Sequence, residues 1–131
     1  MKFSQFRHLH ELIRELIHPD VAIPQLSILY LVYEQGSIPQ QEIGRTLHMP
    51  QGTVSRNVKK LGVVLARDKN SGNFIDKGYG LVSVNYNSPI DPRMAVVSLT
   101  DKGRRTMASI QEILDRDGKH GGMNDYKDEG L

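Results

Sequence analysis

Cysteine is absent from the 131-residue sequence, and this absence excludes several kinds of protein. The chain can form no disulfide, no thiolate metal site, no cysteine nucleophile and no thiol redox sensor. Long apolar runs are also lacking, since no segment approaches the roughly 18 residues that span a bilayer. Charged residues interrupt the N-terminal segment at Arg7, Glu11 and Arg14, which is unlike a signal peptide. We therefore expect a soluble, cytoplasmic protein that has no membrane partner.

Sequence motifs of enzymes are missing as well. The chain has no glycine-rich phosphate loop, no His-x-x-x-His pair and no serine of the nucleophile-elbow type. His8 and His10 are two residues apart, which places them on different faces of a helix and makes a poor metal pair. The other histidines are isolated in the sequence. We expect no catalytic residue, no cofactor and no metal site.

The charges are unevenly distributed along the chain, although the net charge is only +2. Between Gly44 and Arg67 every charged residue is basic: Arg45, Arg56, Lys59, Lys60 and Arg67. From Glu112 onward acidic residues outnumber basic ones. A basic middle segment indicates an anionic partner that meets this part of the chain. A solvated helix face would explain the same charges equally well.

Apolar residues recur at helical spacing in three segments of the N-terminal third. The first segment lies within residues 1–20, and its wide apolar stripe either packs on its own domain or pairs with a second chain. The second is expected to begin at Pro24, to be apolar nearly all round and to end at Gly36. The third is expected to begin at Pro39. These segments predict three helices, of which the second is the central core helix.

The segment Pro50–Leu61 predicts a fourth helix with two different faces. Val54, Val58 and Leu61 are spaced i, i+4 and i+7, which gives an apolar seam. The remaining face is polar and basic, and it carries Gln51, Thr53, Ser55, Arg56, Asn57, Lys59 and Lys60. Two helices joined by a few residues, the second polar and basic on its free face, form a helix-turn-helix. Pro50 stands where a capping residue is usual, so this helix begins at Pro50 or one residue later.

Three later segments have the composition of β-strands, namely residues 63–66, 81–86 and 94–99. The residues between the first two segments are rich in turn formers. Thr100 is a good N-cap for a last helix, which Gly118 is expected to end. Residues 118–131 are glycine-rich and polar, and we expect them to form a disordered tail. The predicted fold class is α+β, mainly α.

The order of four helices, a β-wing and a last helix resembles the MarR (multiple-antibiotic-resistance regulator) family of winged-helix transcription factors. The resemblance is carried by four motifs: Ile43-Gly44-Arg45-Thr46-Leu47, Gly52-Thr53-Val54-Ser55-Arg56, Asp91-Pro92-Arg93 and Val97-Ser98-Leu99-Thr100-Asp101-Lys102-Gly103. The first two motifs are shared by many helix-turn-helix proteins, whereas the last two are more specific. The resemblance spans residues 3–117. It implies a winged helix-turn-helix domain at residues 21–100, with a dimerisation helix on either side.

The resemblance also implies a symmetric homodimer in which the N-terminal helix (residues 1–20) and the C-terminal helix (residues 101–117) pack together. The expected interface residues are apolar: Phe3, Phe6, Leu9, Ile13, Leu16, Ile110, Ile113 and Leu114. The fourth helix would be a recognition helix that enters the major groove of double-stranded DNA. Arg93 would reach the adjacent minor groove from the wing, and Asp91 would orient Arg93.

The residue types of the recognition helix fit this role independently of the family. A major groove about 12 Å wide admits one helix. Gln51 and Asn57 could each bind adenine, and Arg56 could bind guanine. Contacts to phosphates are expected from Thr53, Ser55, Lys59 and Lys60. The sequence therefore predicts a DNA-binding face on this helix.

The wing is longer than the resemblance implies, because residues 67–97 include an additional segment that contains glycines and aromatic residues. We favour an enlarged wing that reaches further along DNA, with Lys69 and Lys77 on phosphates. The additional segment could instead cover apolar surface or bind a protein.

From these features we expect a dimeric, sequence-specific transcriptional regulator that represses by occupying a promoter. The alternative is a winged-helix module for protein docking, or for replication or partition complexes, that lacks operator specificity. MarR-like proteins often bind a small-molecule effector between the dimer helices and the DNA-binding lobe. The sequence identifies no such effector, and a regulator without one fits it equally well.

Overall fold

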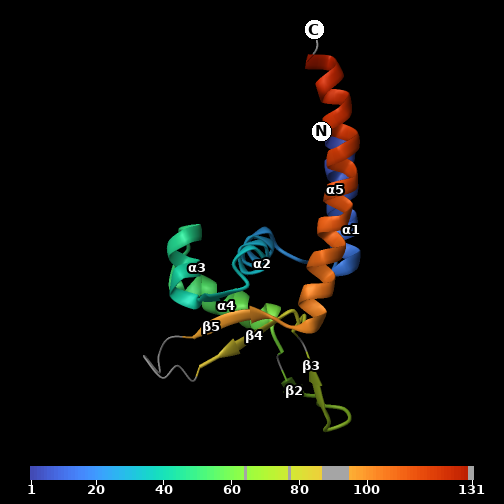
Figure 1. The fold of residues 1–131 in the computed structure, drawn as a ribbon. Coiled ribbons are helices and arrows are strands. Elements are labelled where there is room, and N and C mark those ends of the chain that lie inside the picture. The colour runs from blue at the N-terminus through green and yellow to red at the C-terminus, as the bar shows by residue number, and fades with distance from the viewer. Residues whose placement is uncertain (64, 77, 87–94, 130–131) are drawn as a thin grey trace.

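The computed structural model describes residues 1–63, 65–76, 78–86 and 95–129. The described residues form five helices and five short strands (Figure 1). The helices are α1 (Phe3–Leu16), α2 (Ile23–Gln35), α3 (Gln40–Leu47), α4 (Gln51–Leu61) and α5 (Asp101–Glu129). The strands are β1 (Ser37–Pro39), β2 (Leu65–Arg67), β3 (Phe74–Asp76), β4 (Val82–Asn85) and β5 (Val96–Leu99). Helix α1 lies inside its predicted range, and α2, α3 and α4 each begin within one residue of the predicted start. The predicted order of the helices is therefore confirmed.

Helix α2 is the centre of the fold, as its apolar sequence predicts. Its N-terminus is closed by Gln25, whose side-chain oxygen accepts the backbone N–H of Ala22 at 2.9 Å. It ends at Gly36, whose backbone has a φ of +83°, a value that residues other than glycine rarely adopt. Most of its apolar side chains are buried, including Leu26, Ile28, Leu29, Leu31 and Val32.

The predicted apolar seam of α4 is confirmed. Val54, Val58 and Leu61 are all at most 2% exposed and belong to the same core as α2. The opposite side of this core is closed by Leu81, Val82 and Val97 of the sheet segments. Helix α4 is therefore fixed through one face, and its polar face is left toward solvent.

A three-stranded antiparallel sheet has the order β1-β5-β4. Val97 of β5 is paired with Ile38 of β1 on one side and with Val84 of β4 on the other. The short strand β1 thus joins the helices to the wing strands β4 and β5. The connection between β4 and β5, residues 87–94, lies outside the described residues.

The prediction of one enlarged wing over residues 67–97 is wrong, because this stretch forms parts of two separate ribbons. Strands β2 and β3 pair only with each other in the described sheets, with Arg67 opposite Phe74. The ribbon is closed where the N–H groups of Tyr79, Gly80 and Leu81 donate to the carbonyls of Lys60, Gly62 and Leu61. These bonds return the chain to the end of α4 before β4 begins, so the additional residues pair among themselves.

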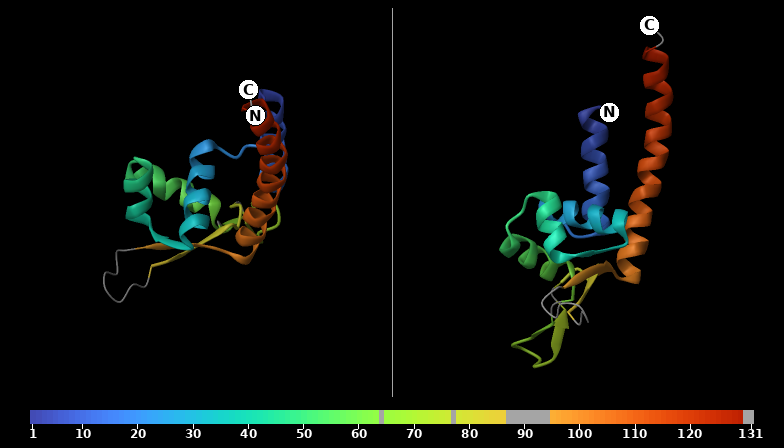
Figure 2. Two further views of the ribbon diagram at one scale, coloured as in Figure 1. Left: turned by 45° about the horizontal axis from the view of Figure 1, so that its top comes forward. Right: turned by 60° about the vertical axis from the view of Figure 1, so that its left-hand side comes forward.

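The last helix does not end at Gly118 as predicted. Helix α5 continues to Glu129. Glycine inside a helix costs only about 1 kcal/mol relative to alanine, and it ends a helix when it takes up a left-handed conformation. Gly118 keeps a helical backbone instead. Helices α1 and α5 extend from the winged-helix body in the same direction, so both chain ends lie at one end of the molecule (Figure 2).

Candidate nucleic-acid interface

Helices α3 and α4 form the predicted helix-turn-helix. Residue His48 closes α3 in a left-handed conformation with a φ of +55°, and the N–H of Met49 then donates to the carbonyl of Gly44 at 2.9 Å. The two helices meet at Gly44, where an added Cβ would lie 2.9 Å from the Met49 oxygen and 2.3 Å from Nε2 of Gln51. A residue with a side chain does not fit this contact. Gly44 therefore sets the distance between α3 and the recognition helix.

Gln51, a candidate for adenine binding, is exposed and bonded to α3. Its Nε2 donates to the backbone carbonyl of Gln41 at 3.3 Å. The side chain therefore links the first turn of α4 to α3, and its contact with adenine stays a prediction.

The exposed side of α4 brings the other candidate residues of this helix together. Arg56, Lys59 and Lys60 are exposed, and Thr53, Ser55 and Asn57 are half-buried beside them. We call these six residues the α4 face. Helix α4 has no acidic residue in its sequence, so the α4 face presents positive charge and hydrogen-bonding groups to an anionic partner.

Two side chains of the α4 face bond within the helix. An Nη of Arg56 donates to Oγ1 of Thr53 at 3.4 Å, and Nδ2 of Asn57 donates to the Thr53 carbonyl at 3.0 Å. The guanidinium is thereby drawn over the first turn, toward the end of α4 that reaches bases in a helix-turn-helix. Its remaining N–H groups point outward from an exposed side chain.

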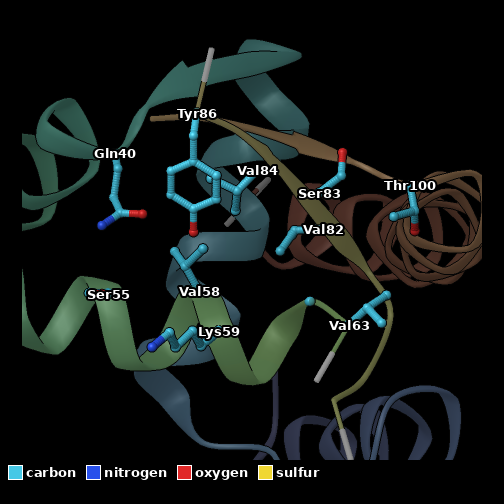
Figure 3. Close-up of a pocket in the computed structure, with 11 residues that line it drawn as sticks. Gln40, Ser55, Val58, Lys59, Val63, Val82, Ser83, Val84, Tyr86 and Thr100 are labelled. Carbon is cyan, nitrogen blue, oxygen red and sulfur yellow. The ribbon is translucent and has the colours of Figure 1, made fainter. Parts of the chain in front are cut away.

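A cleft of about 360 Å³ separates α4 from strand β4 (Figure 3). Ser55 and Lys59 border it on the helix, and Val84 and Tyr86 border it on the strand side. At its other end Gly62 approaches the carbonyl of Val82, which would lie 3.3 Å from an added Cβ. Strand β4 therefore begins beside the C-terminal end of α4 and runs back along the helix, so that Tyr86 lies over its middle (Figure 3).

Other candidate residues lie away from the α4 face. Lys69 is exposed in the turn between β2 and β3. Lys77, Asp91 and Arg93 lie outside the described residues. The structure thus gathers six of the ten candidate DNA-binding residues on the α4 face, bonds Gln51 at the start of α4 to α3, and puts Lys69 on a separate ribbon.

The Ser98-Leu99-Thr100-Asp101-Lys102-Gly103 motif forms a junction between α5 and the segment that follows β3. The Thr100 hydroxyl donates to the Gly80 carbonyl at 2.6 Å and accepts the N–H of Gly103 at 3.0 Å. The predicted N-cap is therefore confirmed. Nζ of Lys102 donates to the Tyr79 carbonyl at 2.9 Å. The motif fixes the base of α5 to the end of α4 through residues 79–81.

Tyr79 is a residue of this junction that the sequence did not single out. Its ring is 7% exposed and is stacked on the imidazole of His18, with ring centroids 4.9 Å apart. Nζ of Lys60 lies 5.6 Å from the centroid of the same ring. Burial, and then the negative charge of Asp20, raise the pKa of Tyr79 above its ordinary value. The sequence signal for this residue was an aromatic side chain between two glycines, but the composition of that segment favoured a turn.

The eight residues expected in a dimer interface fall into two groups. Leu9, Ile13 and Ile110 are at most 7% exposed and belong to the core of the protomer. The apolar stripes of α1 and α5 are wide, so one part of each stripe packs on the core of the protomer while another part stays exposed. Ile113 is half-buried against this core. The remaining four stay exposed as large apolar side chains: Phe3, Phe6, Leu16 and Leu114.

Among the described residues, no group of three histidine, aspartate or glutamate side chains is arranged to hold a metal ion. No helix in this part of the chain is both long and apolar enough to cross a membrane.

The comparisons with known proteins agree with the geometry. The MarR family model matches residues 21–62, which run from the start of α2 to the end of α4. The fold is similar to that of S. aureus MepR in a DNA complex, with 18% identity, a TM-score of 0.69, and coverage of 98% of this chain and 90% of that chain. No curated protein sequence gives a match.

Two structures of MarR proteins are similar in the same way. A structure described as the multiple antibiotic resistance repressor MarR is matched with 18% identity, a TM-score of 0.62, and coverage of 100% of this chain and 88% of that chain. A mutant of E. coli MarR complexed with operator DNA is matched with 18% identity, a TM-score of 0.56, and coverage of 87% and 74%. The chain has the winged-helix fold of the MarR regulators, with a segment at residues 21–62 that matches the MarR family.

Proposed function

We propose that this protein is a dimeric, sequence-specific DNA-binding transcriptional regulator of the MarR type, and that it represses by occupying double-stranded DNA at a promoter. The α4 face carries this proposal, because it joins three cations and three hydrogen-bonding side chains on a helix that the core holds rigidly. Proteins of the same fold have been crystallised with DNA, among them MepR and an E. coli MarR mutant. The helix lies in the major groove in this proposal.

The residues of the α4 face divide the work by chemistry. Arg56 and Asn57 are the base-reading residues, for guanine and adenine respectively. Contacts to phosphates come from Thr53, Ser55, Lys59 and Lys60. Gln51 holds the start of α4 against α3. Arg93 enters the adjacent minor groove from the wing and is oriented by Asp91.

A second copy of the chain supplies the other half of the DNA-binding unit. Phe3, Phe6, Leu16 and Leu114 are exposed apolar side chains on α1 and α5, the two helices that extend away from the winged-helix body. Burying them in a two-fold interface removes apolar area from water. The proposed dimer therefore pairs α1 and α5 across the symmetry axis.

The alternative of a docking or replication accessory module is not favoured, because the matched MarR-type structures include complexes with operator DNA. In this proposal the protein is cytoplasmic and has no catalytic activity and no cofactor. It needs no small-molecule effector to bind DNA.

Arg56→Ala tests the proposal most simply. DNA that the protein binds is selected from a random pool, and the affinity for the selected site is measured by gel shift. We expect Arg56→Ala to weaken binding by about tenfold or more, because each protomer loses a guanine contact. Arg93→Ala should weaken binding similarly.

The matched control is Lys2→Ala, which removes one exposed positive charge near the N-terminus, away from α4. Circular dichroism should show the same fold and the same melting temperature for all three variants. Binding by Arg56→Ala and Arg93→Ala that equals binding by the parent would refute the assigned DNA face.

A further inference from the structure

Strands β2 and β3 form a second ribbon. We call the segment 63–78 that contains them the inserted hairpin. It follows directly on Gly62, the residue after the recognition helix. Its base is fixed by the three backbone hydrogen bonds from residues 79–81 to residues 60–62. The hairpin is therefore attached to the C-terminal end of α4 itself.

The inserted hairpin and strand β4 both start beside the C-terminal end of the recognition helix, and they leave it in different directions. Strand β4 runs back along α4 from Gly62, and Tyr86 lies over the middle of the helix (Figure 3). The inserted hairpin instead projects away from the body, at the end of the molecule opposite to both chain termini (Figure 1; Figure 2, right). Two ribbons thus extend from the same half of the molecule (Figure 1).

The turn of the hairpin is ordered by Asp68. Its carboxylate accepts the Ser71 hydroxyl at 2.8 Å and the N–H of Asn70 at 3.2 Å. Gly72, with a φ of +73°, donates its N–H to the Asp68 carbonyl. The one acidic side chain that the structure describes on the hairpin is thereby bonded to the hairpin's own turn.

The basic side chains of the hairpin, in contrast to Asp68, are available to an anionic partner. Lys69 is exposed at the turn, and the Arg67 guanidinium lies 5.7 Å from the ring centroid of Phe74. A guanidinium stacked on an aromatic ring keeps its charge and its N–H donors while the ring limits its rotation. With Lys59 and Lys60 at the end of α4, these cations continue the basic surface beyond the helix.

We infer that the inserted hairpin is a second DNA-contacting ribbon, which binds phosphates beside the C-terminal end of the recognition helix. This inference rests on the proposed function, and it extends the bound DNA inward from each half-site. Arg67 and Lys69 are the phosphate ligands.

A protein partner fits the hairpin less well than DNA does. Its exposed large apolar side chains in the described residues are Val63 and Phe74, one at the base and one near the turn. Specific protein interfaces have a contiguous buried centre, and about 800 Å² is covered on each partner. Among its described side chains, the hairpin offers two separate apolar residues and exposed cations, and it is continuous with the α4 face. Together these features favour an anionic backbone.

Two variants test the hairpin. In the first, residues 63–78 are replaced by a three-residue Gly-Ser-Gly linker, because Gly62 and Gly80 already lie within one hydrogen bond of each other. In the second, Lys69→Glu leaves the ribbon intact. Lys2→Glu is the control, since it makes the same change in net charge at the opposite end of the molecule. Chromatography and circular dichroism establish that each variant folds and has the parent's oligomeric state.

The readout is affinity for the selected DNA site, measured as a function of salt, together with a hydroxyl-radical footprint. Each phosphate contact contributes about 0.9 to the slope of log affinity against log salt. Because a dimer loses two contacts, Lys69→Glu should reduce this slope by about 2 relative to Lys2→Glu, and should lower affinity about tenfold. The linker variant should also lose footprint protection between the two half-sites.

The outcomes separate the two proposals. If the parent binds a symmetric site but both hairpin variants keep its affinity, salt slope and footprint, the hairpin does not bind DNA and the proposed function stands. If the parent selects no DNA sequence, the proposed function fails and this inference fails with it.

Discussion

At the scale of single residues, Gly103 is required by a contact and not by helix formation. An added Cβ at Gly103 would lie 2.0 Å from the carbonyl oxygen of Leu81, which belongs to the rigid backbone of the junction. Gly52, in the first turn of α4, is different, because a Cβ there would meet only the end of Arg56 at 3.5 Å. Two helical glycines of this chain therefore have opposite tolerance for a methyl group.

We therefore expect alanine substitutions at these two glycines to change the free energy of unfolding in opposite directions. Gly103→Ala should destabilise the protein by more than about 1 kcal/mol, since the backbone must move to admit the methyl group. Gly52→Ala should be neutral or stabilise by up to about 1 kcal/mol, since alanine is the better helix former. Urea unfolding measures both. Equal stabilisation by the two substitutions would mean that α5 does not approach Leu81 closely.

Asp68 gives a prediction about pH at the same scale. The Ser71 hydroxyl, and then the N–H of Asn70, lower the pKa of the Asp68 carboxyl below its ordinary value of 3.8. A lowered folded-state pKa means that these bonds stabilise the turn above pH 3.8 and are lost as the pH falls through the folded-state pKa. Ser71→Ala should raise the pKa toward 3.8, as measured by NMR titration. A pKa that does not change on this substitution would contradict the observed turn geometry.

Residue identities predicted some contacts well and others poorly. Thr100 was recognisable as an N-cap because capping depends on its own side chain and the next three residues. The bond from Gln51 to α3 was not predicted, because its partner is ten residues away and becomes visible only when the two helices are packed. Local bonds can be predicted from sequence, whereas bonds between elements need the fold.

At the scale of elements, the junction at Tyr79 connects three parts of the chain. The Tyr79 ring is stacked on His18, which precedes α2, and lies near Lys60 at the end of α4. The Tyr79 carbonyl accepts the ammonium of Lys102 at the start of α5. This ring therefore helps to fix the recognition helix relative to the helices that are proposed to dimerise.

Truncation of this ring should be costly. Tyr79→Ala should destabilise the protein by about 3 kcal/mol, because it removes a buried aromatic side chain. Tyr79→Phe keeps the ring and should cost less than about 1 kcal/mol. Denaturant unfolding followed by circular dichroism compares the two variants with the parent. If Tyr79→Ala were as stable as Tyr79→Phe, the stack would contribute nothing to the fold.

The elements also show why periodicity predicted helices better than ribbons. The α4 seam repeats every three to four residues within one segment, so its pattern is complete in the sequence. Strands β2 and β3 have three residues each, and the intervening residues are turn formers. Their pairing, and the return of the chain to α4, depend on contacts between distant residues. The sequence indicates an additional segment, but it does not predict that this segment forms a ribbon separate from the wing.

At the scale of the whole molecule, the exposed apolar residues of α1 lead to a prediction about dimerisation. Phe3 is 92% exposed in the protomer, so Phe3→Glu should leave folding unchanged and weaken the proposed dimer about tenfold or more. Val63→Glu is the matched control, because Val63 is also exposed but lies at the base of the inserted hairpin. Sedimentation equilibrium measures both. Dimers of equal strength would place the interface elsewhere.

The central claim is that two copies of this chain read a two-fold symmetric DNA site with their recognition helices. Selection of bound DNA from a random pool at physiological salt tests it most directly. We predict an inverted repeat whose half-sites are about one helical turn, or 10–10.5 base pairs, apart from centre to centre. Recovery of sequences without a shared motif, or of a single unpaired half-site, would contradict it.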